Sequence, residues 1–302
     1  MTRAGGRLRG TLFALSAGVL WGLSGTAAQV LFQRHGIQPQ WLVSVRMLGS
    51  ALILLVVLRP SWPRGNVVRL MVFGIAGLAA VQFTYFAAIS LMGVALATFV
   101  QYLSLPMIAI WEAVAGSTRP GARTIAAVGL AMVGTALLLL ASPHGGGGMR
   151  VSPVGLAFGL LSAVTAAFYT IYSVRIVADI GASRSTAWGF LMGGLAMALV
   201  APPWSAHPTG DGFSVAWLTL FVIVPGTLVP FTLYLGSLRH ITPTEAGTAV
   251  TIEPVSAAMA SALLLSAALV PLQYVGGAAI VIAVLLVRAA GGRAANSVPE
   301  AA

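Results

Sequence analysis

Ten apolar stretches of 16 to 24 residues follow one another along the chain, with turn-forming residues between most of them. A membrane-crossing helix needs roughly 20 apolar residues, because a rise of about 1.5 Å per residue must cover a hydrocarbon core about 30 Å thick. Only 7% of the 302 residues are charged, whereas a soluble domain carries about 25%. The sequence therefore predicts an all-α membrane protein with ten transmembrane helices. The predicted spans are Thr11–Leu31, Trp41–Leu58, Val67–Ile89, Gly93–Trp111, Ala122–Ala141, Pro153–Ile176, Thr186–Ala201, Val215–Gly236, Thr244–Leu265 and Leu272–Val287.

The basic residues indicate how these spans are oriented. All sixteen are Arg, and the net charge is +10. If the N-terminus is cytoplasmic, thirteen Arg lie on inside segments, two (Arg34 and Arg150) lie on outside loops, and Arg46 lies within the second span. This is a strong positive-inside bias. It predicts cytoplasmic N- and C-termini, and it makes the positive charge a sign of topology rather than of a nucleic-acid partner.

A repeat of 148 residues relates the two halves of the sequence. Residues 80–91 read "AVQFTYFAAISL" and residues 228–239 read "LVPFTLYLGSLR", so that Val, Phe and Thr recur at this spacing. A repeated unit of five helices enters the membrane from the opposite side the second time, so the repeat predicts two five-helix halves with inverted topology. We expect a first repeat at 1–143, a Gly-rich linker at 144–152, and a second repeat with a short cytoplasmic tail at 153–302. Two prolines at the same spacing, Pro106 and Pro254, are expected to break helices.

Four motifs resemble a known family. They are "LSAGVLWGLSGTAAQVLFQ", "WLVSVRMLGSALILL", "GVALATFVQYLSLPMIA" and "TPTEAGTAVTIEPVSAAMASALL". Over about residues 10–288 the chain resembles the drug/metabolite transporter superfamily with two EamA-type domains, and most closely its carboxylate, amino-acid and amine branch. The resemblance implies a secondary transporter. Family members export amino acids and other metabolites, and some move drugs or sugars, so the motifs are specific for the fold and poor guides to the substrate.

Glu253 is the most costly residue to place in a bilayer. It lies nine positions after Thr244, about 14 Å along the helix axis and so near the middle of the membrane. An ionisable group at that depth is a functional candidate that could bind a substrate amine or carry a proton. The alternative is a packing or gating role, because its helical face is rich in small residues.

Arg46 is the second ionisable residue inside a span. Its guanidinium could receive a carboxylate through two hydrogen bonds. The alternative is that it reaches outward to the membrane surface or holds neighbouring backbone carbonyls.

Polar and aromatic residues form stripes on several predicted helices. Ser162, Thr165, Tyr169 and Tyr172 recur at i, i+3, i+7 and i+10 of the sixth span. Aromatic bodies with polar tips suit a cavity for a small amphipathic molecule, although interhelical hydrogen bonding is an equally good explanation for any single member. The candidate substrate-binding residues are Trp21, Ser24, Gln82, Tyr85, Phe86, Thr98, Gln101, Tyr102, Tyr169, Tyr172, Tyr234 and Glu253.

No catalytic motif is recognisable. The sequence has no Walker loop, no HExxH and no paired-carboxylate motif, and it has no Cys for a disulfide or a thiolate metal site. We therefore expect no enzyme activity and no cofactor. The sequence favours a secondary transporter of the bacterial inner membrane that exports amino acids or related small metabolites by alternating access. The alternatives are a multidrug exporter of lipophilic cations and, less favoured, a membrane-embedded enzyme. Proton coupling and the choice between monomer and homodimer stay open.

The arginine bias generates a topology prediction. Reporter fusions at the C-terminus and after Thr118 should report a cytoplasmic location, and fusions within Gly145–Gly148 should report a periplasmic one, because Arg-rich segments stay inside. A periplasmic C-terminus would be incompatible with two five-helix repeats.

Overall fold

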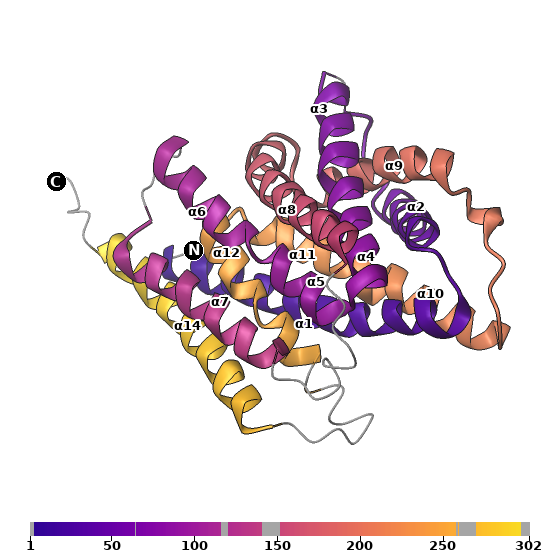
Figure 1. The fold of residues 1–302 in the computed structure, drawn as a ribbon. Coiled ribbons are helices and arrows are strands. Elements are labelled where there is room, and N and C mark those ends of the chain that lie inside the picture. The colour runs from indigo at the N-terminus through magenta and orange to yellow at the C-terminus, as the bar shows by residue number, and fades with distance from the viewer. Residues whose placement is uncertain are drawn as a thin grey trace.

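The structure is a computed structural model that describes residues 3–63, 65–115, 120–140, 152–257, 259 and 270–296. The elements assigned in these residues are all helical and form a bundle (Figure 1). They are α1 (Arg3–His35), α2 (Pro39–Leu58), α3 (Val67–Val72), the π-helix η1 (Phe73–Ala79), α4 (Ala80–Met92), α5 (Val94–Gln101), α6 (Ser104–Ala115), α7 (Ala122–Leu140), α8 (Pro153–Ile180), α9 (Ala182–Val200), the 3-10 helix η2 (Pro203–Ser205), α10 (Gly212–Ile223), the π-helix η3 (Val224–Leu228), α11 (Val229–Ser237), α12 (Pro243–Val250) and α14 (Pro271–Asn296).

Nine of the ten predicted spans correspond to apolar helices in the described residues. Two of these helices, Ala122–Leu137 and Pro271–Leu286, are shorter than a full span. The predicted ninth span is described only to residue 257 and at residue 259, so the total of ten helices remains a prediction. The linker 144–152 lies outside the described residues except for Ser152. The seven helices long enough to cross a membrane are Gly5–His35, Pro39–Leu58, Val67–Met92, Leu96–Ala115, Pro153–Ile180, Ala182–Ser205 and Gly212–Ser237.

The outer surface of the bundle is apolar. Leu199 is 89% exposed, and Val114 and Trp204 are each 82% exposed. Water would disfavour so many exposed apolar side chains, whereas hydrocarbon does not. The exposed faces therefore fit contact with lipid.

Helix starts follow local sequence signals. Pro39, Pro153 and Pro243 each occupy a first helical position, where the missing N–H costs no hydrogen bond. Asp211 caps α10 in the loop outside the apolar helices. Hydrogen bonds from the Ser214 hydroxyl at 2.7 Å, and then from the backbone N–H of Ser214 and of Phe213, lower the pKa of the Asp211 carboxyl.

Within the described residues, four spans depart from a regular α-helix. The third span contains η1 and the eighth contains η3. When 148 is added to the residue numbers of η1, the shifted segment overlaps η3. The fourth breaks at Tyr102–Leu103, between α5 and α6, and the ninth breaks at Thr251–Ile252, after α12. Pro106 and Pro254 lie in the first turn of the helical segment after each break, where their lack of an N–H is harmless. The prolines thus begin the second segment rather than interrupt a continuous helix.

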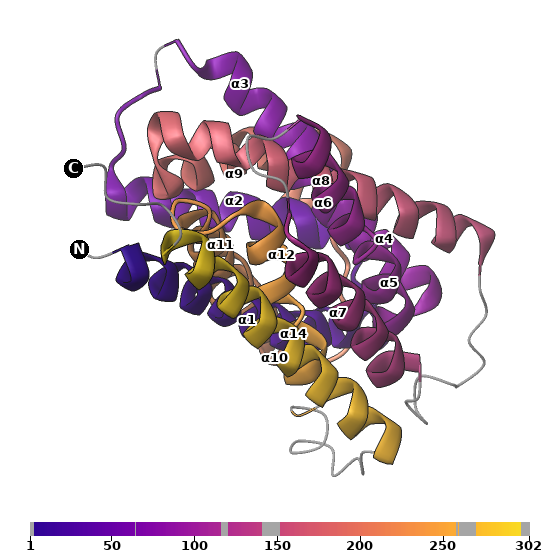
Figure 2. The ribbon, with the colours of Figure 1, turned by 90° about the vertical axis from the view of Figure 1, so that its left-hand side faces the viewer.

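Helix pairs join the two halves of the chain. α7 packs along α14 and α2 packs along α9, so two spans contact their own counterparts in the repeat. Figures 1 and 2 both show α7 and α14 side by side at one flank of the bundle. α4 packs on α8, and its counterpart α11 packs on α1. Exchanging every span for its counterpart leaves this set of pairs unchanged.

The contact of η1 with α9 depends on glycine. Gly193 faces Gly74, and a Cβ on Gly193 would overlap with the carbonyl oxygen of Gly74 and the terminal methyl of Met47. The two backbones therefore approach more closely than any side chain would permit.

Replacing this glycine should destabilise the protein. Gly193→Ala is expected to cost about 1–3 kcal/mol through overpacking, despite the better helix propensity of Ala. The measurement is the midpoint of thermal unfolding in detergent. The matched control is Gly129→Ala on α7, where an added Cβ meets nothing within 4 Å. An equal midpoint for the two variants would contradict the proposed close contact.

Candidate functional site

An open cavity with an empty volume of about 840 Å³, its mouth included, lies among the helices of both halves. It is lined by spans one to four of the first half and by spans six, eight and nine of the second. Most of its wall is apolar or aromatic, with a few polar groups, as is typical of small-molecule sites. The lining residues are Trp21, Ser24, Gly25, Arg46, Val81, Gln82, Tyr85, Phe86, Gln101, Tyr102, Ser104, Leu105, Ile108, Ala166, Tyr169, Thr170, Phe231, Tyr234, Gly247, Val250 and Glu253.

Glu253 reaches the cavity from the residue directly after the break in the ninth span. Its side chain is 7% exposed. The hydroxyl of Tyr102 donates to Oε2 at 3.0 Å, and the hydroxyl of Tyr85 lies 3.4 Å from Oε1. Tyr85 is itself hydrogen-bonded to Thr98 at 2.6 Å. Neither of the two ion pairs found in the described residues includes Glu253, so two phenols, and no cation, face this carboxyl.

Arg46 reaches the same cavity from α2 and is 3% exposed. Its Nε donates to Oγ1 of Thr227 at 2.8 Å, and its guanidinium carbon lies 4.6 Å from the centre of the Phe86 ring. Thr227 donates in turn to the carbonyl of Val222, five residues earlier, at 2.6 Å. This five-residue step is the spacing of a π-helix, and it fixes the hydroxyl that holds Nε. The two terminal nitrogens of Arg46 have no hydrogen-bond acceptor among the described residues.

Aromatic rings form one wall of the cavity. Trp21 lies 4.8 Å from Phe231 and 5.5 Å from Tyr234, measured between ring centres. Tyr169 lies 5.9 Å from Phe231 and 6.0 Å from Tyr234. These separations are those of favourable edge-to-face and offset aromatic pairs. The cavity thus combines a charged region with a flat-sided aromatic region.

The structure brings most of the candidate residues together. Thr98 does not line the cavity but lies behind Tyr85 and bonds its hydroxyl. Tyr172 does not line it either, because its ring stacks on Phe168 and its hydroxyl lies 3.4 Å from the carbonyl of Arg69. Ten of the predicted substrate-binding residues and Arg46 line the cavity, namely Trp21, Ser24, Arg46, Gln82, Tyr85, Phe86, Gln101, Tyr102, Tyr169, Tyr234 and Glu253.

Sequence reasoning did not identify two residues that shape this site. Phe231 lies at the centre of the aromatic wall, and its place in the repeated "FT" motif was a usable signal. Thr227 has no comparable signal, because only the π-helical backbone directs its hydroxyl toward Arg46.

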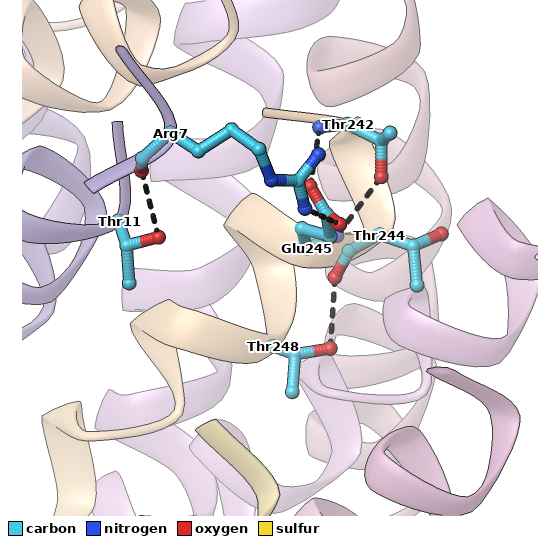
Figure 3. Close-up of polar contacts among 6 residues, drawn as sticks. All are labelled: Arg7, Thr11, Thr242, Thr244, Glu245 and Thr248. Carbon is cyan, nitrogen blue, oxygen red and sulfur yellow. Dashed lines mark hydrogen bonds and ion pairs between the residues drawn. The ribbon is translucent and has the colours of Figure 1, made fainter. Parts of the chain in front are cut away.

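A second polar group lies at the N-terminal end of α12 (Figure 3). Arg7 of α1 forms an ion pair with Glu245 at 2.5 Å. Glu245 also accepts from the backbone N–H of Thr242 at 3.1 Å, and Thr242 accepts in return from the backbone N–H of Glu245 at 3.3 Å. This reciprocal capping box fixes the start of α12. The neighbouring Thr244 donates to Glu112 of α6.

His240 lies beside this group in the turn before α12. Gly6 and Gly10 of α1 are its neighbours. Burial and then the positive charges of Arg9 and Arg239 lower the pKa of His240. This shift favours the neutral form of the imidazole.

Comparison with known proteins matches nearly the whole chain. The sequence profile of the EamA-like transporter family matches residues 8–140 and again residues 153–289. Over 292 residues the chain is 31% identical to the "Uncharacterized inner membrane transporter YicL" of Salmonella typhimurium, covering 94% of this chain and 96% of that protein. A solved crystal structure has a similar fold, with a TM-score of 0.73 and 22% identity, covering 93% of this chain and 97% of that one.

Proposed function

The chain belongs to the EamA-like transporter family and is a membrane transporter, and we propose that it exports amino acids or closely related zwitterions across the inner membrane. One observation carries the proposal. Arg46 and Glu253 are buried residues of opposite charge that line the same cavity. Neither forms an ion pair within the described residues. A zwitterion brings one partner for each.

The Arg46 guanidinium supports recognition of a carboxylate. Thr227 occupies Nε, which leaves both terminal nitrogens for a ligand. Arg binds carboxylates through two parallel hydrogen bonds in this way. The Phe86 ring lies against the guanidinium and restricts its orientation.

The Glu253 carboxylate supports recognition of an amine. Tyr85 and Tyr102 leave it acceptor capacity, since an ionised carboxylate can accept about four hydrogen bonds. The rings of Tyr85 and Phe86, 5.9 Å apart, connect the Glu253 end of the charged region to the Arg46 end. An isolated charge in a membrane interior is costly, so a ligand that compensates both charges at once is favoured.

The aromatic wall supports an alternative substrate class. Lipophilic cations bind over aromatic faces, and Glu253 could balance their charge. Arg46 argues against this alternative, because it would repel a cation and keep its own charge uncompensated.

The arrangement of the helices supports transport by alternating access. The helix pairs map onto one another when the halves are exchanged, and the breaks in spans four and nine lie within one residue of the repeat spacing. Such a repeat lets two near-equivalent halves exchange roles and move the opening of a central cavity from one face to the other.

The Arg7–Glu245 pair supplies a closing contact at one end. It fastens α1 to α12, and α12 ends at the break just before Glu253. The counterpart positions at the repeat spacing are Gly155 and Ala97, which carry no charge. We therefore propose that the Arg7–Glu245 pair is a polar latch that closes the cytoplasmic side of the cavity, with no charged equivalent on the other side at the repeat spacing.

Transport by purified protein tests the substrate class. In liposomes without ATP, the protein should exchange at least one amino acid in counterflow. Arg46→Gln should weaken amino-acid binding by about 10- to 100-fold, as expected for a charge-assisted hydrogen bond, and should leave binding of the decarboxylated amine unchanged. Glu253→Gln should do the reverse, sparing binding of the deaminated acid. The controls are Arg69→Gln and Asp179→Asn, which remove an exposed ion pair on α3 and α8.

Three outcomes would contradict the proposal. Exchange of lipophilic cations without competition from any amino acid would favour the multidrug alternative. Loss of pH-gradient-driven uptake in Glu253→Gln with normal exchange at equal pH would assign Glu253 to proton coupling. Normal transport by Glu253→Gln under both conditions would leave it only a packing role.

The latch is testable because the chain contains no Cys. A Ser104→Cys reporter in the cavity wall can be labelled with a membrane-impermeant thiol reagent in inside-out vesicles. Glu245→Gln keeps the capping box but removes the ion pair, so labelling from the cytoplasmic face should rise several-fold. Arg7→Gln, which leaves the capping box intact, should raise the labelling to the same extent, whereas Asp179→Asn should change nothing. Unchanged labelling in Glu245→Gln would refute the latch.

A further inference from the structure

Three residues that line the cavity each carry a buried side-chain oxygen with no hydrogen-bond partner among the described residues. These oxygens are Oγ of Ser24, Oε1 of Gln82 and the hydroxyl of Tyr169. Their side chains are 2%, 4% and 4% exposed, respectively. Buried polar groups are almost always paired, so unpaired ones on the wall of a cavity point to a ligand that supplies the partner. Ser24 can rotate its hydroxyl toward its own backbone. Oε1 of Gln82 cannot do so, because an amide oxygen only accepts and the N–H groups of α4 are used within the helix.

The chemistry required of the ligand is clearest at Gln82. Its Nε2 donates to the carbonyl of Leu78 at 3.1 Å. A carbonyl can only accept, so the amide cannot turn over without losing this bond. Oε1 is therefore held as an acceptor, and the missing partner must be a hydrogen-bond donor.

The position of Gln82 relates it to the charged region. Gln82 precedes Tyr85 and Phe86 by three and four residues on α4, so the three share one helical face about one turn apart. Tyr85 bonds Glu253, and Phe86 lies against Arg46. One helical turn rises about 5.4 Å. An aromatic side chain on the substrate reaches about as far from its α-carbon.

The surroundings of Gln82 fit a ring rather than a flexible chain. Tyr169 packs close to Gly77, the residue before Leu78, and stacks on Phe73 at 5.7 Å. It continues into the aromatic wall that ends at Trp21 and Tyr234. The aromatic rings between the charged residues and Gln82 favour a flat side chain on the substrate.

We infer that Gln82 is a specificity-determining residue, whose Oε1 accepts a hydrogen bond from a hydroxyl or N–H group at the far end of an aromatic side chain on the substrate. The inference rests on the proposed function, because Arg46 and Glu253 must hold the α-carboxylate and α-amine for the side chain to point toward Gln82. The substrate class is then an aromatic amino acid with a donor at its tip, such as a phenol.

The test compares four probes that differ at the tip of the ring. Dissociation constants are measured on the purified full-length protein for tyrosine and 4-aminophenylalanine, which carry a donor, and for phenylalanine and O-methyltyrosine, which do not. The wild-type protein should bind the first two about tenfold more tightly than the last two. Gln82→Met keeps the side-chain volume and removes the acceptor. In this variant the tenfold preference for tyrosine over phenylalanine should fall to about one, and a thermal unfolding midpoint close to that of the wild type should show that the variant is folded.

The outcomes separate this inference from the proposed function. If phenylalanine binding depends on Arg46 and Glu253 but tyrosine binds within twofold of phenylalanine in the wild type, only the role of Gln82 is refuted. If tyrosine and O-methyltyrosine bind equally, the donor requirement is refuted even without a folded Gln82→Met variant. If no amino acid binds and lipophilic cations do, both the proposed function and this inference are refuted.

Discussion

The interior of a bilayer offers no water to backbone or side-chain polar groups, and this constraint governs where the chain can be irregular. An interrupted helix is tolerated only where protein or a cavity surrounds the free backbone groups. The two full breaks obey this rule. Tyr102 lies in one break and lines the cavity, and Glu253 enters the cavity directly after the other. The same constraint accounts for Arg46, whose charge lies inside the protein rather than against lipid.

Much of the architecture could be predicted because a membrane simplifies the sequence signal. Length and hydropathy identified nine spans that correspond to helices in the described residues. The cost of burying a charge singled out Arg46 and Glu253, which lie in one cavity although more than 200 residues separate them. The family was recognised from motifs, and the profile match confirms it.

The rest could not be predicted because it depends on backbone details that hydropathy does not record. The stripe on the sixth span correctly placed Tyr169 on the cavity but extended too far, since Tyr172 lies beside Arg69 at the end of the neighbouring span. Thr227 is an ordinary residue until η3 turns it toward Arg46. The role of Thr98 could not be predicted either, because its hydroxyl is hydrogen-bonded to Tyr85 while its own side chain does not line the cavity.

The π-helical segment η1 has a consequence for insertions and deletions. A π-turn holds one residue more than an α-helical turn over the same rise, and each residue of an α-helix turns the chain by about 100°. Deleting one codon within Phe73–Ala79 would therefore convert the segment toward a regular α-helix and leave nearly the same face of α4 toward the cavity. Inserting one codon there would exceed what the wide turn already absorbs, and would turn Gln82, Tyr85 and Phe86 away from the cavity by about 100°. This segment should therefore tolerate the loss of one residue better than the gain of one.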